Sequence, residues 1–501
     1  MNRDARLLEE ALVSSDLSDK VDLVLSSPGV DKYRVASSSG SVNFERRRSD
    51  ALVTHKGLGS SFEVTEICGN DPLAEQSISA IGSLEAEKAD RASGVAGGIR
   101  TGANGGTSQT YPNAFESIAQ FFDSPDAPDL YVCRSGEFDP EGNIGQHGSL
   151  GVVQARALMI GSGAGIRQSA VTTSAERTVD IAPTIAALLD LAPNSDGSHL
   201  RGQDGRVLDH ILSGSGASHV VVILLDGCNT NLLREVMVSG HAPNLSALVD
   251  SGSMMEHGMV ASLPTATLAN HTAEITGRHP GHSGVLHHTW LKRSTGEVPD
   301  LLSFEEMFWS ASHLSEGTET IFEVIATQRP GGYTTATFEF CDRGASMSTF
   351  EMVREGTGGA LPDLSECRHV NPVAAQEGKY AFYSTVDHLS MDQTIAAWGQ
   401  DAGNPLPILT WCSLALTDEA GHRSGPHGDL AMQAIIDSDS RVGEIVAAVD
   451  RAGSLAQTAF LVISDHGMEQ ADPQVSGHWH STLSETGVAY RDIGEGLIYL
   501  M

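Results

Sequence analysis

Hydrophobic runs of strand length recur along the chain and alternate with segments of helical periodicity. Apolar runs rich in aliphatic and β-branched residues, bounded by Gly, Asp or Pro, predict strands at residues 155–160, 220–225, 408–416 and 460–463. Apolar positions at helical spacing predict helices at residues 181–191, 244–250 and 430–451. Buried strands that alternate with helices are typical of a parallel sheet covered on both faces. The pattern therefore predicts an α/β fold with a mostly parallel central sheet and helices on both faces.

Acidic residues follow three of these predicted strands. Asp226 comes directly after its strand, and Asp465 and Asp418 come within two residues of theirs. In open α/β sheets, ligands bind beyond the carboxyl ends of the strands. We therefore expect the three carboxylates to meet at one edge of the sheet.

Two histidines accompany these carboxylates. His422 stands four residues after Asp418, so both side chains converge on one ion if the chain forms a single helical turn there. His466 is next to Asp465, and adjacent side chains of an extended strand point to opposite faces, so the backbone has to turn; Gly467 permits that turn. Carboxylates mixed with imidazoles suit zinc or manganese. Two such ions about 3.5–4 Å apart hold the attacking and leaving oxygens of a phosphoryl displacement.

A threonine in the middle of the chain is a candidate nucleophile. Thr267 precedes Asn270, where the sequence predicts the start of a helix. A threonine hydroxyl becomes a good nucleophile when a metal ion takes the place of its proton. A helix N-terminus offers N–H groups and a positive dipole to a phosphoryl oxygen, and Asn270 adds a side-chain N–H donor. Taken alone, the two residues would be interpreted as helix caps, and only the presence of the other motifs favours a catalytic role.

Composition and charge exclude several classes of protein. The 501 residues carry 31 basic and 64 acidic side chains, a formal net charge of −33 that repels nucleic acid and anionic membranes. No run reaches the roughly 18 apolar residues of a membrane span, and the N-terminus has no apolar signal segment, so a cytoplasmic location is expected. Six cysteines without paired spacing are expected to be free thiols, most of them buried. We expect a small-molecule substrate and no nucleic-acid or membrane partner.

Two polar segments predict loops. Residues 85–110 are rich in Gly, Ala and Ser without an apolar period, and they predict a long mobile loop. Residues 193–218 carry Gly and Ser and predict a connection between two parts of the fold.

Five short motifs carry a resemblance to a known family. They are LLDG at 224–227, LPTATLANH at 263–271, TGRHPGHSG at 276–284, TDEAGHRSGP at 417–426 and SDHGM at 464–468. They resemble the type I phosphodiesterase/nucleotide pyrophosphatase branch of the alkaline phosphatase superfamily. The resemblance implies an alkaline-phosphatase-like fold and a metal-dependent phosphodiesterase or nucleotide pyrophosphatase that acts on a small phosphate ester or nucleotide. The family's threonine precedes Phe-Pro-Asn-His, here Leu-Ala-Asn-His, which selects Thr267 over Thr265.

The resemblance also implies two zinc ions, with manganese as the alternative metal. One ion is expected to bind Asp226, Thr267, Asp465 and His466, and the other Asp418, His422 and a third histidine. In the family that histidine follows the Asp-His-Gly motif and precedes a strand and an Asp-Ile-x-Pro-Thr helix. Here the corresponding features stand near the beginning of the chain, within residues 145–184. We therefore expect His147 as the third ligand, with His478 and His480 as the alternatives.

The order of these features resembles a circular permutation of the family chain. In that arrangement residues 1–216 match the C-terminal part of the family fold and residues 217–501 its N-terminal and central parts, and both form one catalytic domain. Residues 496–501 predict a strand that, joined to the N-terminus, would run into a helix. Termini of compact domains often lie close together, so such rearrangements are tolerated.

The implied mechanism is a double displacement. Thr267 attacks phosphorus to give a phosphothreonine, which water then hydrolyses, while Asn270 and the amide of Thr267 hold a nonbridging oxygen. Phosphomonoester hydrolysis, cleavage of phosphonoacetate and a catalytically idle binding role on the same fold stay open as alternatives. The sulfatase signature Cys/Ser-x-Pro-x-Arg is absent around Thr267, which argues against a sulfate ester.

Substrate selectivity is expected to depend on a leaving-group pocket from residues 282–290 and 304–346. Four aromatic residues are candidates to stack on a base, with a place in the core as the alternative: Trp290, Tyr333, Phe340 and Phe350. Four histidines after the nucleophile segment are expected to be packing or substrate-edge residues rather than metal ligands: His279, His282, His287 and His288.

Overall fold

The computed structural model of the protein describes residues 2–48, 60–77, 110–136, 138–169, 176–303, 306–356, 378–399 and 403–501. The loop expected at residues 85–110 lies outside these ranges except for Thr110, and so does Cys367. The five cysteines within them are free, and all but Cys68 are buried, as expected. No described helix is long and apolar enough to cross a membrane.

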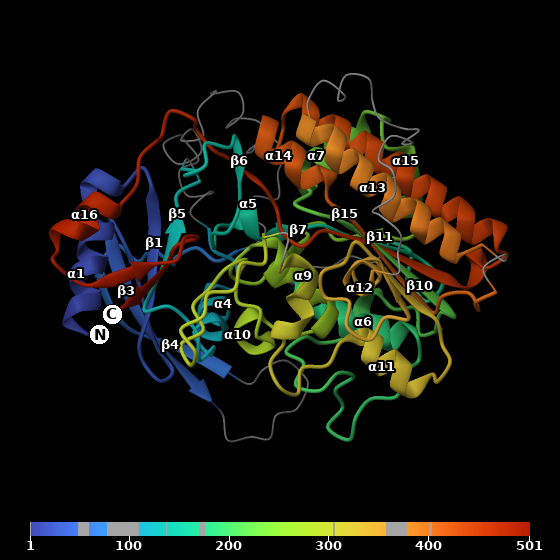
Figure 1. Ribbon diagram of the computed structural model, residues 1–501, viewed down its shortest axis with the longest axis horizontal. Coiled ribbons are helices and arrows are strands. Elements are labelled where there is room, and N and C mark those ends of the chain that lie inside the picture. Colours follow the sequence, from blue (N-terminus) through green and yellow to red (C-terminus); the bar gives the residue numbers. More distant parts are fainter. Residues whose placement is uncertain are drawn as a thin grey trace.

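A seven-stranded sheet lies among helices in the right-hand half of Figure 1. In spatial order its strands are β11 (Ser253–Met254), β8 (Met159–Gly163), β16 (Thr458–Ile463), β10 (His219–Leu225), β15 (Leu409–Leu414), β13 (Thr334–Thr337) and β14 (Met347–Ser348). The strands from β16 to β14 pair in parallel, whereas β8 pairs antiparallel with both β16 and β11. The predicted α/β fold with a mostly parallel central sheet is confirmed.

Helices cover both faces of this sheet because the side chains of β10 alternate between two cores. Val220, Val222 and Leu224 pack in the core that contains α6 (Ile181–Leu188), α9 (Thr267–Thr276) and α11 (Ile321–Gln328). Val221, Ile223 and Leu225 pack with α7 (Thr230–Val238), α8 (Pro243–Ser251), α13 (Gly378–Ala397) and α15 (Asp429–Arg451). The helices predicted at 244–250 and 430–451 are thus α8 and α15, and the one predicted at 181–191 ends three residues early, at Leu188.

The run at residues 155–160 is not one strand, contrary to the prediction. Its beginning closes the short helix α5 (Val152–Ala155) and continues as β7 (Arg156–Ala157), which pairs with β12 (Met259–Val260) in a separate sheet with β9 (Glu176–Arg177). Only the end of the run enters the central sheet, as β8. An apolar run indicates that a segment is buried but not which sheet it joins. Both parts of this run are buried although they belong to different sheets.

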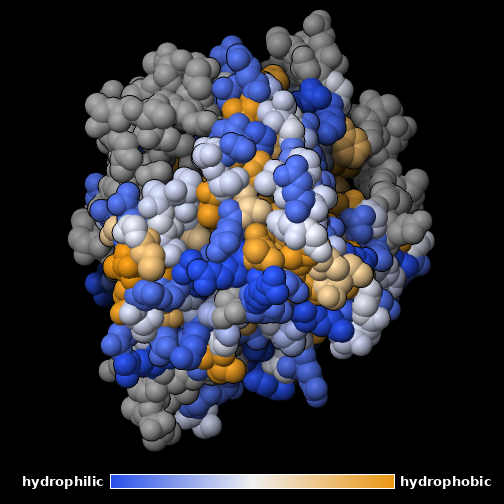
Figure 2. All heavy atoms as spheres, turned by 90° about the vertical axis from the view of Figure 1, so that its left-hand side faces the viewer, coloured by the Kyte–Doolittle hydropathy of each residue, from blue (hydrophilic) through white to orange (hydrophobic). Residues whose placement is uncertain are grey.

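A second, antiparallel sheet contains strands from both ends of the chain. Its order is β18 (Tyr490–Asp492), β19 (Leu497–Leu500), β5 (Leu130–Arg134), β1 (Val21–Gly29), β2 (Lys32–Ser37), β3 (Gly40–Arg48) and β4 (Ser60–Gly69). Helices α1 (Arg3–Leu12) and α16 (His480–Glu485) pack together on the outer face of this sheet. Helix α4 (Ala114–Phe121) belongs to a second core, on the other face of the sheet. Figure 2, which views the molecule from the side of this sheet, shows hydrophilic residues interspersed with smaller hydrophobic patches.

Short elements complete the part of the chain that the structure describes. A two-stranded sheet joins β6 (Gly145–Gln146) to β17 (Glu469–Gln470). The remaining α-helices are α10 (Pro280–Ser283), α12 (Thr349–Glu355) and α14 (Leu416–Ser424). Single turns of 3-10 helix occur at Ser15–Leu17, Thr178–Asp180, Asp209–Ile211 and Leu455–Gln457, and a longer one at Met307–His313.

Candidate active site

The carboxyl ends of β10, β15 and β16 bring the predicted acidic residues to one edge of the central sheet. The N–H of Asp226 donates to the carbonyl oxygen of Leu414, at the end of β15, over 2.9 Å. Oδ1 of Asp465 accepts a hydrogen bond of 3.0 Å from the N–H of Gly227. Gly227 has a φ of 59°, and a Cβ on it would lie 2.5 Å from Oδ1 of Asp418. The close approach of these carboxylates therefore requires glycine at this turn.

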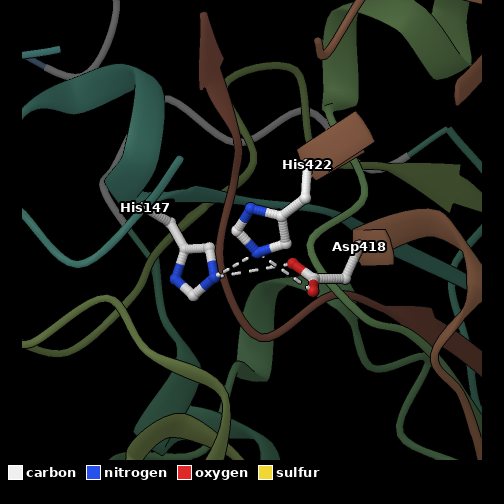
Figure 3. Close-up of side chains that lie close together, drawn as sticks. All are labelled: His147, Asp418 and His422. Carbon is white, nitrogen blue, oxygen red and sulfur yellow. Dashed lines mark hydrogen bonds and ion pairs between the residues drawn. The ribbon is translucent and has the colours of Figure 1, made fainter. Parts of the chain in front are cut away.

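One group of ligand-type side chains, the first cluster, consists of His147, Asp418 and His422 (Figure 3). Asp418 and His422 lie one turn apart on α14, as their spacing predicts, with Oδ2 of Asp418 3.3 Å from Nε2 of His422. His147 follows β6, and its Nε2 lies 3.2 Å from Nε2 of His422 and 3.6 Å from Oδ1 of Asp418. The structure thus brings His147 beside the pair to which the sequence assigned it.

His478 and His480, the alternative ligands, are elsewhere in the molecule. They form a separate group with Asp492 at the beginning of α16. Figure 1 shows α16 at the far left and α14 in the upper part near the centre.

The second cluster consists of Asp226, Asp465 and His466, with Thr267 beside it. Nε2 of His466 lies 3.1 Å from Oδ2 of Asp465 and 3.7 Å from Oδ1 of Asp226. The Thr267 hydroxyl lies 3.3 Å from Nε2 of His466 and donates to Oδ1 of Asp226 over 3.5 Å. The rings of His147 and His466 stack with their centroids 3.8 Å apart, so the two clusters are direct neighbours.

The turn after β16 uses Gly467 in a different way from the one predicted. The φ of Gly467 is not positive. Its N–H donates to the carbonyl oxygen of Gln154 over 2.8 Å, and a Cβ on it would lie 2.3 Å from the carbonyl oxygen of Val153. Glycine is needed here because the segment before β7 packs directly against the backbone.

The three predicted histidine ligands direct Nε2 into the clusters. Nδ1 of His147, His422 and His466 lies 2.8, 2.7 and 2.9 Å from the backbone carbonyl oxygens of Thr265, Gly145 and Gly467, respectively. A carbonyl oxygen only accepts hydrogen bonds, so this network assigns the proton to Nδ1 in each neutral ring. The Nε2 lone pairs are then available to a cation, the arrangement typical of metal-binding histidines.

The carboxylates are buried beside one another. Burial and the neighbouring Asp465 raise the pKa of Asp226 well above its usual value. Burial also opposes the charged form of Asp418, but His422 and His147 outweigh it and lower the pKa of that carboxyl. Among the described residues, Oδ1 of Asp418 and Oδ2 of Asp465 have no hydrogen-bond donor. Buried carboxylate oxygens without donors, next to imidazole Nε2 atoms, fit divalent cations such as zinc or manganese.

Helix α9 places Thr267 and gives Asn270 a role that differs from the expected one. The helix begins at Thr267, three residues earlier than predicted. The side-chain amide of fully buried Asn270 donates to the carbonyl oxygens of Pro264 and Ala266, at 2.9 and 3.2 Å, and its Oδ1 accepts from the N–H of Ser262 at 2.7 Å. The N–H groups of Asn270 are thus engaged by the loop before the helix.

A buried pair behind the second cluster, His271 and Glu339, was not predicted. Both side chains are at most 1% exposed, and Nδ1 of His271 lies 2.9 Å from Oε2 of Glu339. Nε2 of His271 has no hydrogen-bond partner among the described residues and lies 3.9 Å from Oδ2 of both Asp226 and Asp465. Because Asp226 directs Oδ1 to Thr267 and Oδ2 to His271, the pair is placed to orient that carboxylate.

A family model named type I phosphodiesterase/nucleotide pyrophosphatase matches residues 220–500. The chain belongs to this family. The range that matches the phosphodiesterase model contains Thr267, the whole second cluster, Asp418 and His422, whereas His147 precedes it.

Solved structures also resemble this phosphodiesterase family member, at low identity. An inactive variant of murine ectonucleotide pyrophosphatase/phosphodiesterase 5 in complex with AMP is 18% identical over 50% of this chain and 57% of that one, with a TM-score of 0.36. Phosphonoacetate hydrolase from Sinorhizobium meliloti in complex with phosphonoformate gives the same identity and coverages, with a TM-score of 0.34. The chain thus spans a little over half the length of these proteins. A search of curated proteins found no match.

In this member of the phosphodiesterase family the clusters line a cavity of about 590 Å³. Thr267, Asp226 and the whole first cluster contribute to its wall, and many of the other lining residues are aromatic: Phe308, Phe338, Phe340, Phe350, Phe382 and Tyr383. Of the four aromatic candidates for base stacking, Phe340 and Phe350 therefore face the cavity. Trp290 is 1% exposed in the core, and Tyr333 is not among the lining residues.

The four histidines after the nucleophile segment divide into two pairs. His287 and His288 line the cavity, next to one another. His279 packs against Ser262 with a hydrogen bond of 2.8 Å, and His282 forms ion pairs away from the cavity lining.

Proposed function

We propose that the protein is a metal-dependent hydrolase of phosphoric esters, a phosphodiesterase or nucleotide pyrophosphatase, that acts through a phosphothreonine intermediate. The observation that carries this proposal is the Thr267 hydroxyl, which lies at the first position of α9, within 3.5 Å of Asp226 and His466 and at the wall of the cavity. Membership of the phosphodiesterase family supports the reaction class.

The two clusters are the proposed metal sites. Asp226, Asp465, His466 and Thr267 would hold one divalent ion, and His147, Asp418 and His422 would hold the other, with zinc as the proposed metal and manganese as the alternative. Bound there, the ions would lower the pKa of the threonine hydroxyl and neutralise charge on the leaving oxygen. The donor set and the buried carboxylate oxygens without donors support this assignment.

Thr267 supplies the attacking oxygen in the proposed reaction. Its Oγ1, whose proton faces Oδ1 of Asp226, forms a bond to phosphorus while the bond from phosphorus to the leaving oxygen breaks. A phosphothreonine and the free leaving group result. Water then attacks the same phosphorus, the bond to Oγ1 breaks, and the products are a phosphate monoester and the restored hydroxyl.

The first turn of α9 is the proposed binding site for the nonbridging phosphoryl oxygens. The first N–H groups of an α-helix have no acceptor within the helix, and the helix dipole is positive at this end. Asn270 contributes indirectly, because it holds the loop at Pro264 and Ala266 that sets the start of the helix. The aromatic wall of the cavity supports a leaving group that carries a ring, such as a nucleoside.

The test of this function is the ratio of hydrolysis rates for bis-p-nitrophenyl phosphate and p-nitrophenyl phosphate on zinc-loaded protein at mildly alkaline pH. We expect a ratio well above one. A ratio below one would replace the diesterase with a monoesterase. If neither ester is turned over, phosphate release from phosphonoacetate separates a phosphonate hydrolase from a catalytically idle protein.

We also infer that the chain order is permuted relative to the family, with residues 1–216 and 217–501 as parts of one catalytic domain. His147 and β8 precede the matched range but lie beside elements within it. The two ends of the chain are close together, because α1 packs against α16 and β19 reaches β1 through β5 (Figure 1). Both observations support a rearrangement that joins the old termini and opens a loop elsewhere.

A further inference from the structure

A third group of ligand-type side chains, the terminal cluster, contributes no residue to the wall of the cavity. It consists of His478, His480 and Asp492, and one potential ligand atom from each lies within 4.8 Å of the others. Nδ1 of His480 is 3.7 Å from Oδ2 of Asp492. The rings of His478 and His480 stack, with centroids 3.7 Å apart and an angle of 8° between the planes.

The carboxylate of this cluster is held in place before any ligand arrives. The indole N–H of Trp479 donates to Oδ2 of Asp492 over 2.9 Å, and the N–H of Gly494 donates to Oδ1 over 2.9 Å. Trp479 is 3% exposed and packs in the core against Phe138, so it is itself fixed. The side chain of Asp492 is only 6% exposed, whereas that of His480 is 52% exposed. A rigid carboxylate therefore faces two imidazoles that solvent can reach.

We propose that His478, His480 and Asp492 bind a divalent transition-metal ion, with zinc as the expected occupant. Two imidazole nitrogens and one carboxylate oxygen are donors that suit zinc, and the exposed side of the cluster leaves room for water as a further ligand. The hydrogen bonds to Asp492 supply the outer contacts that orient a ligating carboxylate. Calcium and magnesium prefer oxygen donors alone and fit this set poorly.

The bound ion would link two elements near the C-terminus of the chain, α16 and β18. His480 is the first residue of α16, and Asp492 is the last residue of β18. A metal between them ties the helix that packs on α1 to the edge strand of the antiparallel sheet. Since the unfolded chain does not hold these three residues together, the ion stabilises the folded state of this region.

Zinc stoichiometry tests the proposal. Metal-free protein is dialysed to equilibrium against micromolar zinc, and bound zinc is measured by mass spectrometry. We expect the double variant His478→Gln/His480→Gln to bind one zinc fewer than the wild type, whatever the occupancy of the cavity clusters. The control is His241→Gln, which changes an exposed histidine outside all three clusters and should bind as much zinc as the wild type.

A second variant and a local readout test the three-residue geometry. Asp492→Asn keeps an acceptor oxygen for only one of Trp479 and Gly494 and removes the charge, so it should bind the additional zinc more weakly. Zinc should also slow amide hydrogen exchange at residues 478–492 in the wild type and not in the double variant. Equal zinc content in the wild type and the double variant, unchanged exchange in this segment, or full affinity in Asp492→Asn would each overturn the proposal.

Discussion

At the scale of single residues, the geometry of the site depends on the two oxygens of the Asp226 carboxylate, which face different partners. Oδ1 of Asp226 faces Thr267, and Oδ2 faces Nε2 of His271 at 3.9 Å. Glu339 fixes the ring of His271 from the other side and also accepts a hydrogen bond of 2.8 Å from Ser413. Residues that lie behind a metal ligand, as His271 and Glu339 lie behind Asp226, form a second layer that keeps a ligating carboxylate in one orientation.

Substituting Glu339 tests that second layer. Glu339→Gln keeps the size and one acceptor for His271 but removes the charge, so His271 is held less firmly and Asp226 is less well oriented. We expect zinc affinity at the second cluster to fall by about 10- to 100-fold, the usual effect of losing such a partner. Competition with a coloured chelator measures it. Glu323→Gln, on α11, is the matched control, and equal affinities in the two variants would refute the role of Glu339.

At the scale of elements, the short helix α10 joins α9 to segments that pack on the antiparallel sheet. Nδ1 of His282, on α10, lies 2.7 Å from Oδ2 of Asp204, and Nε2 lies 2.9 Å from Oδ2 of Asp123, after α4. Asp123 in turn pairs with Arg46 of β3. Burial opposes the charged form of His282, but the two carboxylates outweigh it and raise its pKa to about 9.

This ion network predicts a specific dependence of stability on pH. The folded-state pKa of His282 is raised from 6.5 to about 9, so its contribution is fully present below pH 6.5 and is lost as the pH rises through about 9. We expect His282→Gln to lower the free energy of unfolding by about 2.5 kcal/mol at pH 7 and by much less at pH 10. Urea unfolding at both values measures the difference. His241→Gln should show no such pH dependence, and an equal loss at both values for His282→Gln would contradict the assignment.

At the scale of the whole molecule, each of the two seven-stranded sheets combines strands from both parts of the chain. His147 and β8 come from the first 216 residues, and Thr267 and the other residues of the two clusters come from the rest. Residues 213–216, between the two parts, are exposed. This arrangement is what the proposed permutation requires of the junction at which the two ends of the family chain are joined.

A rearranged chain tests the permutation. A protein that begins at residue 217, runs to 501, continues through a short Gly/Ser linker and ends with residues 2–216 restores the family order. We expect it to have the circular dichroism spectrum, zinc content and turnover of the natural order. A control chain opened inside buried β10, between Val222 and Ile223, should fail to fold. Failure of both chains would contradict the proposal.

The features of the site that the sequence predicts depend on local patterns of residues. The features that it does not predict depend on contacts between residues far apart in the chain. Asp226 directly follows an apolar run and Asp465 follows one after a single serine, so strand position alone places them at one edge of the sheet. His271 and Glu339 are 68 residues apart, and the only local signal for Glu339 is its place just after β13, a threonine-rich strand without an apolar run. Of the antiparallel sheet, the sequence predicted only the strand at residues 496–501, which is β19. The strand β4 is largely exposed and shows no buried run, whereas β1 and β5 contain buried runs that were not predicted as strands.

The central claim is that Thr267 is the nucleophile, and the turnover of Thr267→Ala, measured together with its zinc content, tests it most directly. We expect zinc content near that of the wild type, because three carboxylates and three histidines remain in the two clusters. We also expect loss of measurable turnover of bis-p-nitrophenyl phosphate. Thr267→Ser, which keeps a hydroxyl, should retain part of the activity. Turnover of Thr267→Ala close to the wild-type rate, at normal zinc content, would contradict the account.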